Sequence, residues 1–154
     1  FCRLPQAAMP SSPTPPAATT TPAPPQAAAA RVAVLGNPAV LHTSFLNDGI
    51  AAKIRADGCE PVLLPLELSA SSDALLEDYL PWAAEQGICD IIYVQSFGCL
   101  ASHILGRGAM KRIRAEHPEV NITFIDYDPG ASEVNQLNRL KLALSIARQR
   151  TAAG

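Results

Sequence analysis

Cys99 is the residue in this chain whose type and position most clearly permit chemistry. It comes five residues after the apolar, β-branched run Ile91–Val94, which is typical of a strand buried on both faces. From Leu100 onward the apolar residues recur at helical spacing, so the thiol is expected where a strand is followed by a helix. The positive end of a helix dipole favours the thiolate, which is the form of cysteine that attacks electrophiles and ligates metals. His103, four residues further on, would lie on the same helix face.

The same residues also have a purely structural interpretation. Free cysteine is among the most buried residue types and often packs as a small apolar side chain. A histidine at helical spacing needs no ligand, because a helix surface or a packing contact explains it. Two features favour a site at Cys99: its position at a strand end, and the neighbouring Gly98, which lets backbone or ligand approach closely. Both interpretations of Cys99 stay open on the sequence alone.

Strand-like and helix-like patterns alternate after residue 30. Strands are expected at 31–35, 59–64, 91–94 and 121–126. Helices are expected at 45–56, 73–86, 100–117 and 133–150. The last helix carries a stripe predicted to face the core: Val134, Leu137, Leu140, Leu144 and Ala147. This alternation predicts an α/β fold, with a flavodoxin- or Rossmann-like parallel sheet of about four strands and helices on both faces.

The carboxyl ends of parallel strands meet at one edge of a sheet, where open α/β proteins bind their ligands. Four loops would share that edge: 37–44, 65–72, 96–99 and 126–132. The residues that could converge there are Asn37, His42, Cys99, Asp126 and Asp128. Cys59 and Cys89 come at strand starts, so they are predicted to be structural residues at the opposite edge.

Residues 1–30 are predicted to be a disordered linker ahead of a folded domain at 31–150. The segment holds 8 of the 14 prolines, and Arg3 is its only charged residue. It lacks the periodic large apolar residues that could offset the entropy of ordering it. It has no basic start followed by an apolar core, as a targeting peptide would. No run in the chain approaches the roughly 20 apolar residues that span a bilayer.

The folded part carries 11 Lys and Arg against 14 Asp and Glu, a net charge of −3. A weakly acidic domain with few aromatic residues shows no electrostatic footprint for nucleic acid. The four cysteines are scattered without CxxC spacing, which suits neither a disulfide framework nor a structural zinc site. A reduced, cytoplasmic setting is therefore expected.

Several common chemistries do not fit the loops. Arg107 lies eight residues after Cys99, too far for the C-x5-R phosphate loop of a cysteine phosphatase. A nucleophilic pair of Cys99 with His42 lacks an identifiable orienting group. The carboxylates over 126–133 could bind a divalent cation, but turn and helix-cap preferences explain them more simply. Neither a GxGxxG fingerprint nor a P-loop is present.

Three stretches of the chain are distinctive: FGCL at 97–100, HILGRG at 103–108 and DYDPGASEVNQLNR at 126–139. With a looser match through GNP at 36–38 and FLNDGI at 45–50, the chain resembles the closing part of the large proteins related to the 2-hydroxyacyl-CoA dehydratase activator. In that family of acyl-CoA dehydratase activase-related proteins, activator-type ATPase modules are joined to a region similar to the dehydratase subunits.

The resemblance implies a cytoplasmic, oxygen-sensitive system of anaerobic metabolism. Dehydratase-type subunits hold a [4Fe-4S] iron–sulfur cluster through cysteine thiolates and pass a low-potential electron to an acyl-CoA. Only Cys99 matches such a metal-ligand position here, so further ligands are expected from another domain of the same larger protein or from a dehydratase or activase partner. The cofactor-binding residues expected beside it on the shared strand-end edge are Asn37, His42, His103 and Asp128.

Two other functions remain open, and no catalytic residue is identified. One is a non-catalytic scaffold or docking domain of the same family, in which Cys99 is merely packed. The other is a stand-alone domain that binds a small molecule in a closed pocket. Neither nucleic acid nor a membrane is expected as a partner.

Overall fold

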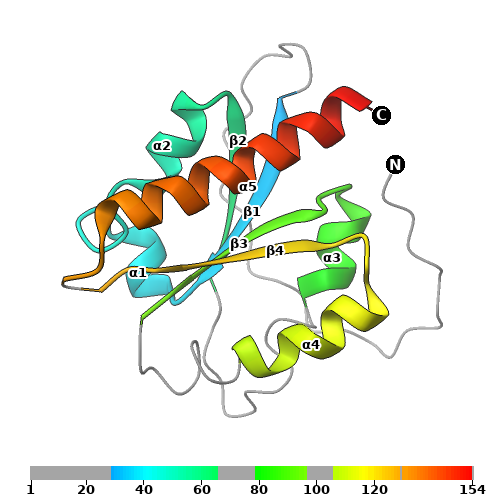
Figure 1. Cartoon of the computed structure of the whole chain (residues 1–154), viewed down its shortest axis with the longest axis horizontal. Helices are drawn as coiled ribbons and strands as arrows, with labels where there is room; N and C mark the ends of the chain where they lie inside the picture. The colour runs from blue at the N-terminus through cyan, green and yellow to red at the C-terminus, as the bar shows by residue number, and fades with distance from the viewer. Residues whose placement is uncertain (1–28, 66–78, 97–105, 129, 154) are drawn as a thin grey trace.

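The computed structural model in Figure 1 describes residues 29–65, 79–96, 106–128 and 130–153. Its elements are β1 (Ala30–Gly36), α1 (Pro38–His42), α2 (Ile50–Ala56), β2 (Cys59–Pro65), α3 (Tyr79–Glu85), β3 (Asp90–Gln95), α4 (Gly106–Glu116), β4 (Asn121–Asp126) and α5 (Glu133–Ala153). The elements therefore extend slightly beyond the predicted domain at 31–150. Residues 1–28 of the predicted linker lie outside the described residues, and so do Cys99 and His103.

The four described strands form one parallel sheet in the order β2-β1-β3-β4. Each strand coincides with one of the predicted apolar runs, because β-branched and aliphatic side chains suit a sheet covered on both faces. The central strand β3 is buried along its whole length and pairs with β1 on one side and β4 on the other. The predicted flavodoxin-like α/β class is confirmed. In the described part of the chain, no helix is long and apolar enough to cross a bilayer.

Helices cover both faces of the sheet and divide the core into two clusters (Figure 1). On one face, Leu80 and Ala83 of α3 and Ile113 of α4 pack on alternate strand residues such as Tyr93. On the other face, α1, α2 and α5 pack on the strand residues of opposite parity. Side chains alternate between the faces of a strand, so each apolar run supplies both clusters.

The segment after β1 differs from its prediction. Residues 39–44 were expected to be a loop and 45–56 a helix, but α1 begins at Pro38 and α2 only at Ile50. The side-chain oxygen of Asn37 accepts a hydrogen bond from the backbone N–H of Ala39 at 2.9 Å, and proline suits the first position of a helix. Phe45, predicted to lie in that helix, precedes α2 and is 92% exposed.

The predicted core stripe of α5 is only partly correct. Leu140, Leu144 and Ala147 are buried against the sheet, as expected. Val134, in the first turn of α5, is 69% exposed. Apolar spacing identified the inward-facing side of the helix but not the length over which the helix contacts the core.

Gly36 ends β1 at a very close approach to β3. A β-carbon at this position would lie 2.7 Å from the backbone oxygen of Val94 and 3.2 Å from the Val94 Cβ atom. Backbone cannot move aside as a flexible side chain can, so only glycine fits here. This contact brings the carboxyl ends of the two central strands together.

A matched pair of glycine substitutions tests this contact. Gly36→Ala should lower the free energy of unfolding by about 1–3 kcal/mol through overpacking. Gly108→Ala should instead raise it by about 0.5–1 kcal/mol, because Gly108 lies in α4 with no atom within 4 Å of an added β-carbon. Urea unfolding of both variants measures the difference. Equal effects would refute the tight β1–β3 approach.

Candidate functional site

The carboxyl ends of β1 and β3 mark the topological switch point of the sheet. The chain leaves β1 to form β2 on one side, and the later strands β3 and β4 lie on the other. Open α/β sheets bind ligands outside the carboxyl ends of the strands at such a point, because the connections diverge there. Asn37 follows β1, and Gln95 and Ser96 are the last described residues on the β3 side.

Two side-chain hydrogen bonds join the ends of β3 and β4. Gln95 pairs in register with Asp126, and its Nε2 donates to the Asp126 Oδ1 at 2.5 Å. The next residue, Ser96, donates from its Oγ to the Asp128 Oδ1 at 2.5 Å. Hydrogen bonds to ionised carboxylates are short and stronger than those between neutral groups. The exits of both strands are therefore held together by consecutive polar contacts.

Asp126 also connects this edge to α5. The Arg139 Nη1 lies 3.9 Å from the Asp126 Oδ2, and the Gln136 Nε2 donates to the Asp126 backbone oxygen at 2.7 Å. The side chain of Asp126 is 27% exposed. Solvent screens an ion pair at this exposure, so the contact with Arg139 adds little to stability. It does place a cation beside the carboxylate.

Gln95 is the least expected member of this edge. The residue is 1% exposed, and its Oε1, like the His117 Nδ1 and the Glu119 Oε1, is buried without a hydrogen-bond partner among the described residues. An unsatisfied buried acceptor costs free energy, so each instance in a native protein needs a physical reason. Gln95 was not among the predicted site residues. The available signal was a polar side chain at the end of the apolar run Ile91–Val94.

Tyr127 links the β4 exit to the turn before α2. Its backbone N–H donates to the backbone oxygen of Gln95 at 2.9 Å. Its half-buried ring packs against the core on the α5 face. Burial raises the pKa of Tyr127 to about 12, and the negative charge of Asp48 adds to this effect. Asp48 has a positive φ of 51°, which is uncommon for a residue other than glycine, and it pairs with Lys53.

The structure places the described predicted residues as follows. Asn37 caps α1, and Asp128 accepts the hydrogen bond from Ser96. His42 is exposed at the last position of α1, and no described contact joins it to the other two. Cys99 and His103 lie outside the described residues, so their predicted roles remain predictions.

The described cysteines are at the amino edge of the sheet, as predicted for Cys59 and Cys89. Cys59 is a buried free thiol, and burial raises its pKa, which favours the unreactive protonated form. Cys89 is disulfide-bonded, which differs from the expectation of reduced cysteines throughout. Within the described ranges, no group of three or more His, Cys, Asp or Glu residues could hold a metal ion.

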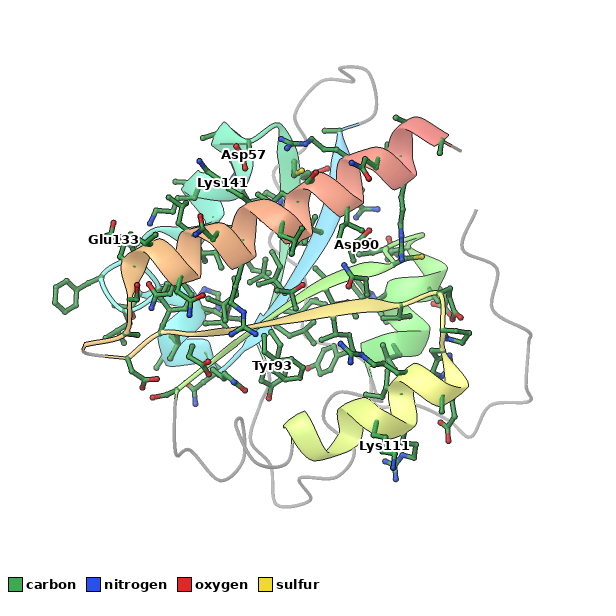
Figure 2. All side chains as sticks on the ribbon, viewed as in Figure 1. Asp57, Asp90, Tyr93, Lys111, Glu133 and Lys141 are labelled. Carbon is green, nitrogen blue, oxygen red and sulfur yellow. The ribbon has the colours of Figure 1, made fainter. Side chains whose placement is uncertain are left out.

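The amino edge contains a buried carboxylate, Asp90, at the start of β3 (Figure 2). The Asn121 Nδ2 donates to its Oδ1 at 3.0 Å, and the Arg150 Nη1 lies 3.9 Å from its Oδ2. Burial raises the pKa of Asp90, while Asn121 and Arg150 oppose that shift.

Three arginines donate to carbonyl oxygens in the turns that precede strands at this edge. Arg31 donates to Gln86 before β3 at 3.2 Å, Arg148 donates to Asp57 before β2 at 2.5 Å, and Arg150 donates to Glu119 before β4 at 2.7 Å. At the amino edge these side chains bond to backbone, but two atoms in the turn before β4, the His117 Nδ1 and the Glu119 Oε1, are also buried without a hydrogen-bond partner among the described residues. The topology of the sheet, with its switch point between β1 and β3, favours the carboxyl edge as the ligand site.

The raised pKa of Asp90 predicts a pH-dependent stability. A carboxyl whose folded pKa lies above its unfolded value of about 3.9 stabilises the fold when protonated, and loses this contribution as pH rises through the folded pKa. The free energy of unfolding of Asp90→Asn should therefore increase relative to that of the wild type as the pH rises through the folded pKa of Asp90. Urea unfolding at a series of pH values measures this difference. Glu85→Gln, an exposed position on α3, controls for the lost charge. Parallel pH profiles for wild type and Asp90→Asn would contradict the prediction.

Comparison with models of known protein families finds no match to this chain. A search among curated proteins also finds no significant relative. The α/β fold therefore rests on the structure, and the resemblance to the dehydratase activator-related proteins rests on the sequence stretches alone.

Proposed function

We propose that this is a dehydratase-subunit-like domain of an acyl-CoA dehydratase activase-related protein. In this proposal its carboxyl edge is the functional site, and Cys99 contributes one thiolate to a [4Fe-4S] cluster for low-potential electron transfer. The proposal rests on one observation: β3 ends at Gln95, beside the switch point of the sheet. Cys99 follows Ser96 by three residues in the sequence, so the chain enters the FGCL stretch directly from this edge.

The described residues do not by themselves form a cluster site. Iron–sulfur clusters are held mainly by cysteine thiolates, whereas the described groups at the carboxyl edge are amides, carboxylates and a hydroxyl. The thiol of Cys59 and the disulfide-bonded Cys89 lie at the amino ends of β2 and β3. Every ligand other than Cys99 therefore has to come from outside the described part of this chain. We propose a neighbouring domain or a dehydratase or activase partner as their source.

Cytoplasmic location and anaerobic metabolism belong to the same proposal, since the resemblance implies them. The disulfide at Cys89 counts against a reducing compartment, because disulfides are rare in cytosolic proteins. Thiol labelling of the freshly isolated protein, performed under anaerobic conditions, would show whether Cys89 is reduced in the cell.

The cluster proposal predicts a specific loss on replacing one thiol. After anaerobic reconstitution together with its partner domain, the wild type should bind iron and show a visible charge-transfer band. Cys99→Ser should lose both, because serine does not replace the thiolate ligand efficiently. Iron per chain and the absorbance spectrum are the measurements.

Cys59→Ser is the matched control, because Cys59 is a buried thiol at the opposite edge. It should retain iron, provided that circular dichroism shows that it folds. Equal iron uptake by the wild type and Cys99→Ser would remove Cys99 from the site. No iron uptake by the wild type with its partner would leave the docking function as the better explanation.

A second candidate function is docking without a cofactor. It is favoured by large apolar side chains that the domain leaves in solvent: Phe45 at 92% exposure, Val134 at 69%, Leu142 at 64% and Leu46 at 46%. Single exposed apolar residues are common, but aromatic residues as exposed as Phe45 are enriched at protein interfaces. Under this proposal the surface binds a dehydratase-type subunit or a neighbouring domain of the same larger protein.

The docking proposal predicts that Phe45 contributes strongly to association. Phe45→Ser should weaken binding to the separately expressed partner domain by about tenfold or more, as measured by sedimentation velocity. Lys141→Ser, at an exposed polar position on α5, should leave binding unchanged. Equal binding by both variants would argue against Phe45 as an interface residue.

A further inference from the structure

The unpartnered Oε1 of Gln95 has a fixed orientation. The Nε2 of the same amide donates to the Asp126 Oδ1 at 2.5 Å. Turning the amide over would place Oε1 against a carboxylate oxygen, and two acceptors repel each other. The oxygen is therefore held away from Asp126, in a residue that is 1% exposed. A buried acceptor held in this way has lost its hydration without gaining a partner.

The chemistry around Gln95 restricts what could satisfy this oxygen. A carbonyl oxygen accepts hydrogen bonds only, so its partner must carry an N–H or O–H group. The nearby side chains Asp126 and Asp128 are carboxylates, and Arg139 is the cation beside Asp126. A negatively charged ligand group would face these carboxylates and would find no donor at Gln95.

The hydrogen-bond partner of Gln95 is partly exposed. The side chain of Asp126 is 27% exposed, so the network that begins at buried Gln95 reaches solvent there. Gln95 and Asp126 are register partners at the carboxyl ends of neighbouring strands. A small polar group entering beside Asp126 would arrive at the edge where α/β sheets bind their ligands.

We infer that Gln95 is a binding residue that accepts a hydrogen bond from a neutral amide or hydroxyl group of a ligand at the carboxyl edge of the sheet. The site selects against anionic groups such as carboxylates. This inference rests on the proposed ligand site at this edge, but it requires neither iron nor Cys99. Failure of cluster reconstitution would therefore leave it standing.

Propionamide and propionate are suitable probes, because they have nearly the same shape but differ in charge and in the presence of an N–H donor. Each would be titrated into the full 154-residue chain, labelled with ¹⁵N, while the side-chain amide resonances of Gln95 and the backbone amide of Asp126 are followed. Propionamide should produce saturable shifts at both positions. Its affinity should exceed that of propionate by about tenfold, the value of one net hydrogen bond.

Gln95→Met removes the acceptor while keeping the length of the side chain. It should abolish the propionamide response at the Asp126 amide. Gln149→Met is the matched control, because it makes the same substitution at an exposed residue near the end of α5, away from the carboxyl edge. This variant should retain the response. The wild-type titration decides the question alone if Gln95→Met does not fold.

Three results would overturn the inference. The first is the absence of saturable shifts with propionamide in the wild type. The second is an equal response to propionate. The third is a protein–water Overhauser signal at the Gln95 amide that persists at saturating propionamide, since a resident water would then be the partner of Oε1.

Discussion

The central strand β3 is the constraint on which the rest of the domain depends. It is buried at every residue, so each of its backbone N–H and C=O groups must be paired within the protein. Pairing with β1 and β4 provides those partners and fixes the register of both neighbours. The register in turn sets which side chains stand together at each end of the sheet, including Gln95 beside Asp126.

The two ends of the sheet satisfy their polar groups in different ways. At the amino edge, arginine side chains cap the carbonyl oxygens of the strand-entry turns, and Asp90 has partners from β4 and α5. At the carboxyl edge, side chains bond to each other across β3 and β4. Among the described residues, Gln95 at the carboxyl edge and His117 and Glu119 at the amino edge each keep a buried polar atom without a hydrogen-bond partner. What distinguishes Gln95 is that its unsatisfied atom is held on a strand at the edge where open α/β sheets bind ligands, whereas His117 and Glu119 lie in a turn at the opposite edge.

Much of the fold could be predicted because its signals are local. The run Ile91–Val94 identifies a buried strand, and the alternation of such runs with helical patterns indicates a parallel sheet. The pair Asn37-Pro38 also carries a local signal for a helix start, because asparagine caps helices and proline is favoured at the first helical position. The prediction of a loop at 37–44 did not use that signal. Val134 was wrongly predicted to face the core, because apolar spacing does not reveal where contact with the core ends. The start of the helix at Phe45 was wrong, because α2 begins only at Ile50.

The site was less predictable than the fold. Convergence of loops at the carboxyl edge follows from topology, so Asn37 and Asp128 could be proposed there. The bond between Gln95 and Asp126 depends on the register of two segments that are 31 residues apart. One sequence does not contain that register, because a shift by one residue changes which side chains share a face.

The arginine caps have a consequence for how the chain reaches its native state. Arg148 and Arg150 both lie near the end of α5, yet they bind turns that precede β2 and β4. During synthesis these turns are made well before the helix that stabilises them. Contacts between segments so distant in sequence form late and slow the search for the native topology. The turns before β2 and β4 must therefore remain without these caps until α5 docks, which makes them the vulnerable part of the amino edge in a newly made chain.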